Sequence, residues 1–378
     1  MGKSRHKSLK LFAQLSVQYP ALQPNRPISY QGQLAIKVLG FLQMNMRHFV
    51  LFAAALAAIP SVCKADGVAP FGIASAYNLV ALGTVDSNGN TLIAGNVSTS
   101  ADVTGRVAAA GMVLTGTTIG SSLNGDPWGS LATYDLVSTG GLNAGEQFNV
   151  NSHGNVYAPG SNGSFNFNGG GHRDTCCSSG IDFDILRTTL DAQSLGLAAL
   201  TATGDALGTN QSGVNPSFFV LKGTSSTLNI FTITAAQFSD TNHPLDIQAP
   251  AGSTIIINVT GTHPTLGTGI YYNESQNSGN SSLNDNILFN FADAQTVTIN
   301  GQFNASLLAP FAVLTGNAQM GGNFIAAAIG QTGEVHNNEF TGILDPPPTA
   351  SAPEPGSFVL MGSGLVAFAG AMRRRFRP

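Results

Sequence analysis

The sequence predicts a mainly β fold, a β-solenoid like a right-handed β-helix with one accompanying α-helix. Short β-branched runs bounded by Gly or Asn, such as residues 254–259 and 296–299, are typical of strands and turns. One segment, from Ile181 to about Leu207, differs because its apolar side recurs at three- and four-residue steps, which favours an amphipathic helix. The residues on that side are Phe183, Leu186, Leu190, Ser194, Leu197 and Leu200.

Two stretches look like related turns of one architecture. Residues 102–120 and 297–316 both alternate a β run, a Gly or Asn corner, small residues and another β run. Both contain Val-Leu-Thr-Gly, at 113–116 and at 313–316. Small residues at corners and aliphatic residues facing inward suit coils that bury their faces against each other. A β-sandwich also has short strands at regular spacing, so it stays the alternative fold.

Before the β-rich region, a secretory signal peptide is predicted at residues 44–65. Met46-Arg47-His48 supplies a basic start, residues 49–58 supply the apolar centre, and Cys63-Lys64-Ala65 supplies a cleavage site. Asp66 would begin the mature chain.

The stretch 1–43 carries basic residues and no acidic residue, and it fits neither a signal nor a domain. We therefore interpret it as an upstream extension, with translation starting at Met44 or Met46.

The predicted extracellular β domain, residues 66–345, is strongly acidic. The chain has a formal net charge of −4, but all twenty acidic residues lie between Asp66 and Glu354. Four basic residues lie in that range, which leaves −16 there. Nucleic acid is therefore an unsuitable partner, because its recognition needs a basic surface. Solubility outside the cell, or ion bridging to acidic polysaccharide, suits this charge.

The C-terminal region has three parts. A Pro-rich linker and Pro-Glu-Pro motif occupy residues 346–356, an uncharged stretch occupies 357–372, and a basic tail occupies 373–378. The uncharged stretch predicts a transmembrane helix of about 24 Å, at 1.5 Å per residue. Basic residues beside a membrane segment stay on the cytoplasmic side.

This tail resembles the PEP-CTERM sorting signal. The resemblance implies recognition by an exosortase, a membrane enzyme that cuts near the motif. It also implies an inner-membrane-anchored precursor that later reaches the cell surface or the extracellular matrix. The residues assigned to sorting are Pro353, Glu354, Pro355, Arg373, Arg374 and Arg375. A plain membrane anchor is the alternative.

The β domain resembles the choice-of-anchor A domain over roughly residues 70–342. The resemblance begins with Ala76-Tyr77-Asn78-Leu79-Val80 and with residues 102–109. It continues through 287–291 and Leu307-Leu308-Ala309-Pro310, and it ends at 333–340. It departs at Ala110, where a second glycine is common. It implies a β-helical fold with a helix beside it and a surface adhesive or matrix role, without catalytic residues.

The patterns that could carry chemistry are weak. Asp86-Ser87-Asn88-Gly89-Asn90 has the oxygen spacing of a calcium loop, but Thr91 stands where glycine is required, so a tight hairpin turn is favoured. Asp182 and Asp184 are expected to cap the helix that follows. We expect no catalytic site, no metal and no cofactor. The scattered histidines and the pair Tyr271-Tyr272 are predicted to be structural. The neighbours Cys176 and Cys177 either remain reduced or form bridges to another molecule.

The functional prediction is an exported, non-enzymatic surface or matrix protein that adheres to, or structures, an exopolysaccharide layer. Its predicted partners are an exosortase, extracellular polysaccharide and the membrane. Ice binding is the first alternative, but the threonines considered for an ice-binding array do not recur at a fixed step; they are Thr99, Thr104, Thr115, Thr117 and Thr118. A polysaccharide-degrading enzyme is the second alternative, and it would need a groove with converging carboxylates.

Overall fold

The computed structural model describes residues 68–152, 154–160, 163–208, 215–276 and 284–344. They belong to one compact unit.

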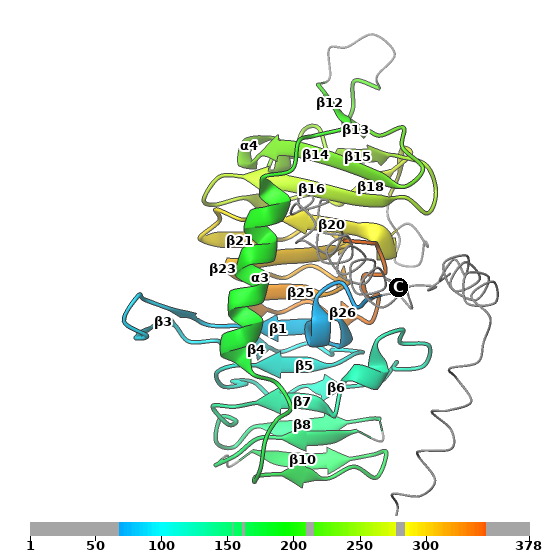
Figure 1. The fold of residues 1–378 in the computed structure, drawn as a ribbon. Helices are drawn as coiled ribbons and strands as arrows, with labels where there is room; N and C mark the ends of the chain where they lie inside the picture. The colour runs from blue at the N-terminus through cyan, green and yellow to red at the C-terminus, as the bar shows by residue number, and fades with distance from the viewer. Residues whose placement is uncertain (1–67, 153, 161–162, 209–214, 277–283, 345–378) are drawn as a thin grey trace, which may run out of the picture. The chain divides into compact units, whose positions relative to one another are not determined.

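The largest sheet places ten parallel strands side by side (Figure 1). In spatial order they are β14 (Leu228–Thr234), β16 (Thr254–Thr260), β20 (Ile287–Asn290), β23 (Ser306–Gly316), β25 (Phe324–Gln331), β1 (Leu79–Ala81), β5 (Val107–Ala109), β7 (Tyr134–Ser138), β9 (Asn155–Tyr157) and β11 (Arg173–Asp174). The first strand of the described chain thus lies in the middle of the sheet, between β25 and β5.

A second row of strands continues from this sheet. The long strands β23 and β25 shift register between Ala309 and Val313, and their C-terminal parts pair with other strands. Those strands are β21 (Thr296–Ile299), which also pairs with β17 (Thr265–Leu266), and β4 (Val97–Thr99).

A third row is made of two groups of parallel strands, and Val103 joins the two groups through isolated β-bridges. One group is β22 (Phe303–Asn304), β24 (Met320–Gly321) and β26 (Val335–His336), and the other is β6 (Thr118–Ile119), β8 (Gln147–Val150) and β10 (Ser164–Phe167). Val103 bridges to Val335 in the first group and to Ile119 in the second. Successive coils of the chain therefore contribute strands to each of three rows.

Two smaller sheets complete the β structure of the described residues. One contains β12 (Asp205–Leu207), β13 (Phe219–Lys222), β15 (Leu245–Gln248), β18 (Tyr271–Tyr272) and β19 (Ser275–Gln276). The other is the hairpin of β2 (Thr84–Val85) and β3 (Thr91–Ile93), which projects from the sheets as an arm in Figure 1.

Helix α3 (Phe183–Ala198) connects the two halves of the large sheet. The strands β1, β5, β7, β9 and β11 follow one another toward one end, and α3 then runs back along the sheet (Figure 1). The strands from β14 to β25 return to the middle, where β25 pairs with β1. The other helices are short: α4 (Ala235–Phe238) and the 3₁₀ helices η1 (Gly72–Ala76), η2 (Gly129–Leu131) and η3 (Asn284–Asn286).

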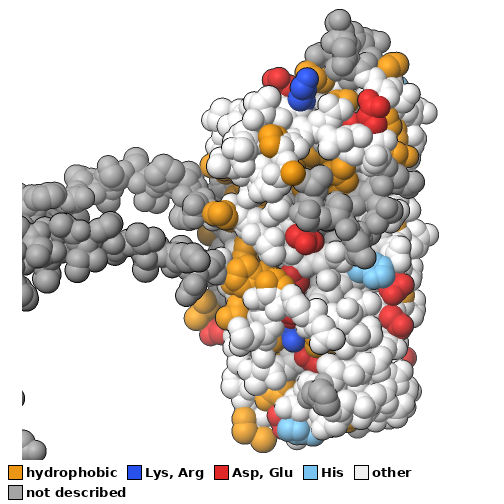
Figure 2. Space-filling model, turned by 90° about the vertical axis from the view of Figure 1, so that its right-hand side faces the viewer, with side chains coloured by type: hydrophobic (Ala, Val, Ile, Leu, Met, Phe, Trp, Pro, Cys, Tyr) orange, Lys and Arg blue, Asp and Glu red, His pale blue; other side chains and the backbone are white. Residues whose placement is uncertain are grey.

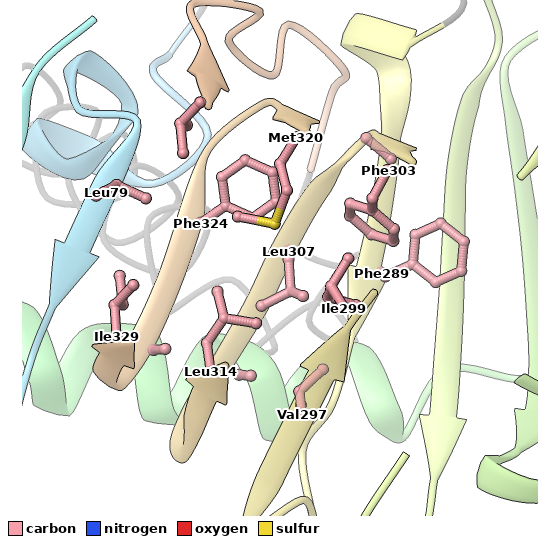
Figure 3. Packing of buried hydrophobic residues seen from close by; sticks show 14 of the residues in the cluster. Leu79, Phe289, Val297, Ile299, Phe303, Leu307, Leu314, Met320, Phe324 and Ile329 are labelled. Atoms are coloured by element: carbon pink, nitrogen blue, oxygen red, sulfur yellow. The ribbon is translucent and has the colours of Figure 1, made fainter. Parts of the chain in front are cut away.

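The main core lies between the three rows. Its side chains come from strands of every row and point toward one another, as Figure 3 shows for Leu79, Phe303, Leu314 and Phe324. Aromatic rings form part of it, with the Phe289 and Phe303 centroids 5.1 Å apart. A second apolar cluster lies between α3 and the large sheet. Strands such as β25 are therefore buried on both faces, which explains their continuous apolar runs.

Helix α3 forms where the periodicity predicted it. Asp182 is the N-cap residue, and its carboxylate accepts from the backbone N–H of Asp184 and of Ile185, each at 3.1 Å. Five of the six residues of the predicted apolar side are buried, and Leu200 is partly buried. The prediction of this helix is confirmed, although it ends at Ala198 rather than near Leu207.

The fold class is confirmed at the coarse level, since the described residues are mainly β with parallel sheets and two α-helices. The handedness of the coil stays a prediction. Among the described residues, no helix has the length and apolar character needed to cross a bilayer. The predicted transmembrane segment 357–372 and signal peptide 44–65 lie outside the described residues.

Candidate functional site

One row of strands presents a regular, uncharged surface, which we call the threonine face. Its strands alternate buried aliphatic residues with partly exposed residues on the outer side. The outer residues that define it are Thr265, Thr296, Thr298, Val313, Thr315, Ala328, Gly330 and Ser98. None of them carries a charge, although the range from Asp66 to Glu354 has a formal charge of −16.

Register aligns these residues in columns. Thr265 pairs with Thr298, and Thr298 pairs with Thr315, so three threonines stand on adjacent strands. Gly330 and Ser98 continue the same column. Parallel neighbours repeat at about 4.8 Å, so the hydroxyl and methyl groups of this column recur at that spacing.

Hydrogen bonds fix the orientation of several of these side chains. The hydroxyl oxygens of Thr298 and Thr315 are 3.1 Å apart, and Nδ1 of His263 is 2.9 Å from Oγ1 of Thr296. Cross-strand threonine pairs of this kind contribute about 0.2–1 kcal/mol each. The result is a preorganised array of hydroxyl and methyl groups, suited to an extended and repetitive ligand surface.

Of the threonines weighed from the sequence, Thr115 reaches this face, because its hydroxyl oxygen is 3.5 Å from that of Ser98. Thr99 and Thr117 are buried, with exposed fractions of 1% and 6%. The aligned residues Thr265, Thr298 and Thr315 are 33 and then 17 positions apart in the chain. Because the coils between these threonines differ in length, no fixed spacing in the sequence marks the alignment. It is seen only when the strands are paired. The sequence signal for this face was the Thr-Val-Thr-Ile run at 296–299 and the Val-Leu-Thr-Gly run at 313–316.

A cavity of about 850 Å³ lies between the β2–β3 hairpin and the start of α3. Asp182 and Asp184 line it together with Arg187. Both carboxylates are already engaged, because Asp182 caps the helix and Asp184 accepts from Nη2 of Arg187 at 2.7 Å. In this cavity they do not form the free carboxylate pair that glycoside hydrolysis requires.

The calcium-like loop is a hairpin turn, as the sequence favoured. Oδ1 of Asp86 accepts from the backbone N–H of Asn88 and of Asn90, each at 2.8 Å. Gly89 has a φ of 84°, a left-handed value that glycine adopts without strain. Hydrogen bonds from Asn90, followed by those from Asn88, lower the pKa of Asp86.

The remaining candidates make short-range contacts with neighbouring residues, and Asp174 lies near Cys177. His172 and His243 pair with Asp174 and Asp240, with ring nitrogen to oxygen distances of 3.2 and 2.8 Å. Cys176 and Cys177 are exposed free thiols. Tyr272 is buried and its hydroxyl donates to the carbonyl of Asn304 at 3.2 Å, which agrees with a packing role.

Sequence reasoning missed a buried ionic network around Arg106. Its Nε donates to Asp135 at 2.8 Å, and its Nη1 pairs with Asp126. Burial alone would lower the pKa of Arg106, but the two aspartates outweigh it and raise that pKa. The network ties the loop before η2 to the large sheet. The sorting residues predicted from the sequence, Pro353, Glu354, Pro355 and Arg373–Arg375, lie outside the described residues.

Structural comparison finds ice-binding proteins. One from the Antarctic ascomycete Antarctomyces psychrotrophicus is 11% identical with a TM-score of 0.34, and covers 71% of this chain and 96% of its own. One from an Antarctic biological consortium is 12% identical with a TM-score of 0.31, and covers 71% and 90%. A glycosylated one from an Arctic yeast is 10% identical with a TM-score of 0.28, and covers 74% and 97%. No curated protein matches the sequence.

Two family models match the sequence. The PEP-CTERM protein-sorting motif matches residues 351–375. The family described as "Putative Ice-binding-like adhesive domain" matches residues 70–337, which is well over half of the chain. The protein therefore belongs to the family of ice-binding-like adhesive domains and carries a PEP-CTERM sorting motif at its C-terminus.

Proposed function

We propose that this exported surface protein is an adhesin of an exopolysaccharide layer and that the threonine face is its binding surface. The observation that carries the proposal is the aligned column of Thr265, Thr298 and Thr315 on a surface without charged residues. The family description supports an adhesive role. The scaffold would be a β-solenoid of the choice-of-anchor A type.

The chemistry of the face suits a neutral stretch of sugar polymer. Each threonine offers a hydroxyl that donates and accepts, beside a methyl group that packs on the apolar side of a sugar ring. One such contact is weak, with about 0.5–1.5 kcal/mol per hydrogen bond. Contacts repeated along one polymer chain act together, so that the combined binding far exceeds each single contact.

Delivery to the surface would depend on the C-terminal tail. An exosortase would recognise Pro353-Glu354-Pro355 while residues 357–372 hold the precursor in the inner membrane and 373–378 stay in the cytoplasm. The matched sorting motif supports this sequence of events. Residues 44–65 would direct export, and residues 346–356 would separate the β domain from the membrane.

Ice binding is a second candidate, and the same threonine column favours it. An ordered array of hydroxyl and methyl groups can also hold ordered water against a solid surface. The column is interrupted, however, because Gly330 and Ser98 follow Thr315, and Val313 and Ala328 follow Thr296. Because of this interruption, we rank ice binding below polysaccharide binding as the function of the face.

The test compares substitutions on and off the face. Thr298→Lys places a long charged side chain in the centre of the column, whereas Thr232→Lys places the same change on the exposed side of β14. We expect Thr298→Lys to weaken binding of the full chain to purified exopolysaccharide at least about tenfold, because it blocks neighbouring contacts as well as its own. A double Thr298→Val, Thr315→Val variant removes hydroxyls and keeps shape, with an expected loss of about 2–10-fold per hydroxyl.

Each outcome has a definite meaning. Equal polysaccharide binding by the wild type and Thr298→Lys would refute the threonine face as the binding surface. Inhibition of ice recrystallisation by the wild type and not by Thr298→Lys, without polysaccharide binding, would replace adhesion by ice binding.

A further inference from the structure

A cavity of about 280 Å³ lies where three distant segments of the described chain meet. The loop containing Asp126, the 3₁₀ helix η3 containing Asp285 and the closing segment 337–341 all line it. Hydrogen bonds hold these segments together. Nδ2 of Asn337 donates to the carbonyl of Ser122 at 2.8 Å, and the backbone N–H of Thr341 donates to the carbonyl of Asp285 at 2.6 Å.

Unpartnered oxygen atoms concentrate in this cavity. Glu339 is only 4% exposed, and neither of its carboxylate oxygens accepts a hydrogen bond of ordinary geometry. Its polar neighbours are the carboxyl group of Asp126 and the backbone N–H of Trp128. Oδ1 of Asp285 and Oδ1 of Asn337 are also buried without a partner. All four atoms accept and cannot donate when the carboxyl groups are ionised. A buried acceptor left without a donor destabilises the fold, and a charged acceptor does so more strongly.

Nearby carboxylates make the shortage of hydrogen-bond donors and cations around these oxygens greater. Asp126 stands in the same wall and already pairs with Arg106, while the other Arg106 contact goes to Asp135. The arginine is therefore shared between two other carboxylates. Burial, followed by the neighbouring Asp126, raises the pKa of Glu339 to about 10, and burial also raises the pKa of Asp285. No basic side chain lines the cavity, and Arg106, which acts to lower the pKa of Glu339, is already paired with Asp126 and Asp135.

We propose that this cavity is a Ca²⁺ site, with Glu339, Asp285 and Asn337 as its protein ligands. Carboxylate and amide oxygens are the donors that Ca²⁺ prefers, and Ca²⁺ accepts six to eight oxygens at about 2.3–2.6 Å. The cavity has room for an ion and several waters, since one water occupies about 30 Å³ in the liquid. Among the described residues, no group of three or more His, Cys, Asp or Glu is placed to hold a metal. Waters and the asparagine oxygen must therefore complete the coordination shell.

Binding here would have a structural consequence. The ion would link Asp285 of η3 to Asn337 and Glu339 of the closing segment, beside the loop that contains Asp126. Ca²⁺ would therefore stabilise the closed domain, in the affinity range of about 10⁻⁴–10⁻³ M that extracellular calcium modules show.

The single tryptophan of the chain supplies a local probe. The indole Nε1 of Trp128 donates to the carbonyl of Phe340 at 3.0 Å, next to Glu339 in sequence. Tb³⁺, which replaces Ca²⁺ at oxygen sites, should therefore show luminescence sensitised by Trp128 when it binds to the full chain. Added Ca²⁺ should displace it. Calorimetric titration with CaCl₂ gives the affinity directly.

Variants separate an ion site from a purely structural role. Glu339→Gln keeps the shape and removes the charge, and Glu334→Gln makes the same change on a side chain that is 44% exposed. We expect Glu339→Gln to weaken Ca²⁺ binding at least about tenfold and Glu334→Gln to leave it unchanged. Asp285→Asn should weaken it as well, and circular dichroism checks that each variant is folded.

Thermal unfolding provides an independent comparison. In chelator, Glu339→Gln should unfold at a Tm equal to or above that of the wild type, because a buried unpaired carboxyl is removed. At a Ca²⁺ concentration 100 times the Kd, the wild-type Tm should rise by about 5 °C and that of the variant should not. Absence of Ca²⁺ binding by the wild type, or equal binding by Glu339→Gln and Asp285→Asn, would overturn the proposal.

Discussion

At the scale of single residues, buried polar side chains hold together segments that are far apart in sequence. Nδ2 of Asn323 donates to the carbonyls of Ser75 and Tyr77 at 2.9 Å, and its Oδ1 accepts from the backbone N–H of Phe340 at 2.7 Å. Asp191 on α3 is an opposite case, because its buried Oδ1 has no hydrogen-bond partner. Burial raises the pKa of Asp191, and Arg187 only partly offsets this.

Asp191 should therefore make the stability of the domain depend on pH. Its pKa in the folded state is above the ordinary value of 3.8, so the folded state holds the proton more tightly than the unfolded state. The stabilisation is complete below pH 3.8 and is lost as pH rises through the folded pKa. Asp191→Asn should flatten this acidic part of the profile and increase stability at pH 7, by no more than about 1 kcal/mol.

Urea unfolding of the full chain between pH 3 and 7 measures this effect. Asp205→Asn, on the exposed strand β12, is the matched control and should leave the free energy of unfolding within a few tenths of a kcal/mol. A wild-type profile that rises with pH no less steeply than that of Asp191→Asn would contradict the assignment.

At the scale of elements, α3 covers a sheet that is apolar on both faces. One side of the helix packs against strands of the large sheet, including β16, β20 and β23. A polar contact lies within this interface, where the hydroxyl of Ser194 donates to Oδ1 of Asn290 at 2.6 Å. Asn290 also donates to Oδ1 of Asn258 at 2.8 Å. The helix thus stabilises the sheet by apolar burial and by a satisfied polar chain.

Two leucines of α3 allow the packing to be measured. Leu190 is fully buried against the sheet, while Leu195 is 55% exposed. Leu190→Ala should lower the free energy of unfolding by about 2–5 kcal/mol, since it loses apolar burial and leaves a cavity. Leu195→Ala, on the same helix, should change it by less than about 0.5 kcal/mol. If chemical denaturation showed similar losses of unfolding free energy for the two variants, the buried side of α3 would not be the side that stabilises the domain.

At the scale of the whole molecule, charge is distributed unevenly along the chain and sparsely over the described surface. Figure 2 shows a face on which uncharged side chains predominate and charged side chains are few. All but four of the sixteen basic residues lie outside the range from Asp66 to Glu354. The described domain therefore carries few basic side chains, which are Arg106, Arg173, Arg187 and Lys222.

Processing of the tail is tested on the whole chain. We expect the wild type to lose residues 373–378 in cells that contain the exosortase and to retain them in cells that lack it. Replacing Pro353, Glu354 and Pro355 by alanine should preserve the intact tail in both strains, because the recognised extended segment is gone. The same triple replacement at Pro346, Pro347 and Pro348 is the control and should be cut normally. Intact mass measurement distinguishes these cases, and an uncut wild type in every strain would mean a simple membrane anchor.

Local pattern alone determined several features of this protein. The periodicity of residues 183–200 predicted α3 and its buried side, and Asp182 marked its start. The Asn88-Gly89 pair predicted the hairpin, and alternating β-branched runs predicted a mainly β fold. These features depend on neighbours within a few residues, so one sequence is sufficient to recognise them.

Other features were decided only by the tertiary structure. The pairing of β1 with β25 joins residues about 245 positions apart, and no local signal marks it. The threonine column and the oxygen-lined cavity at Glu339 both depend on that closure and on coils of unequal length. Sequence spacing cannot reveal such sites, because register between distant strands is fixed by burial of the whole core.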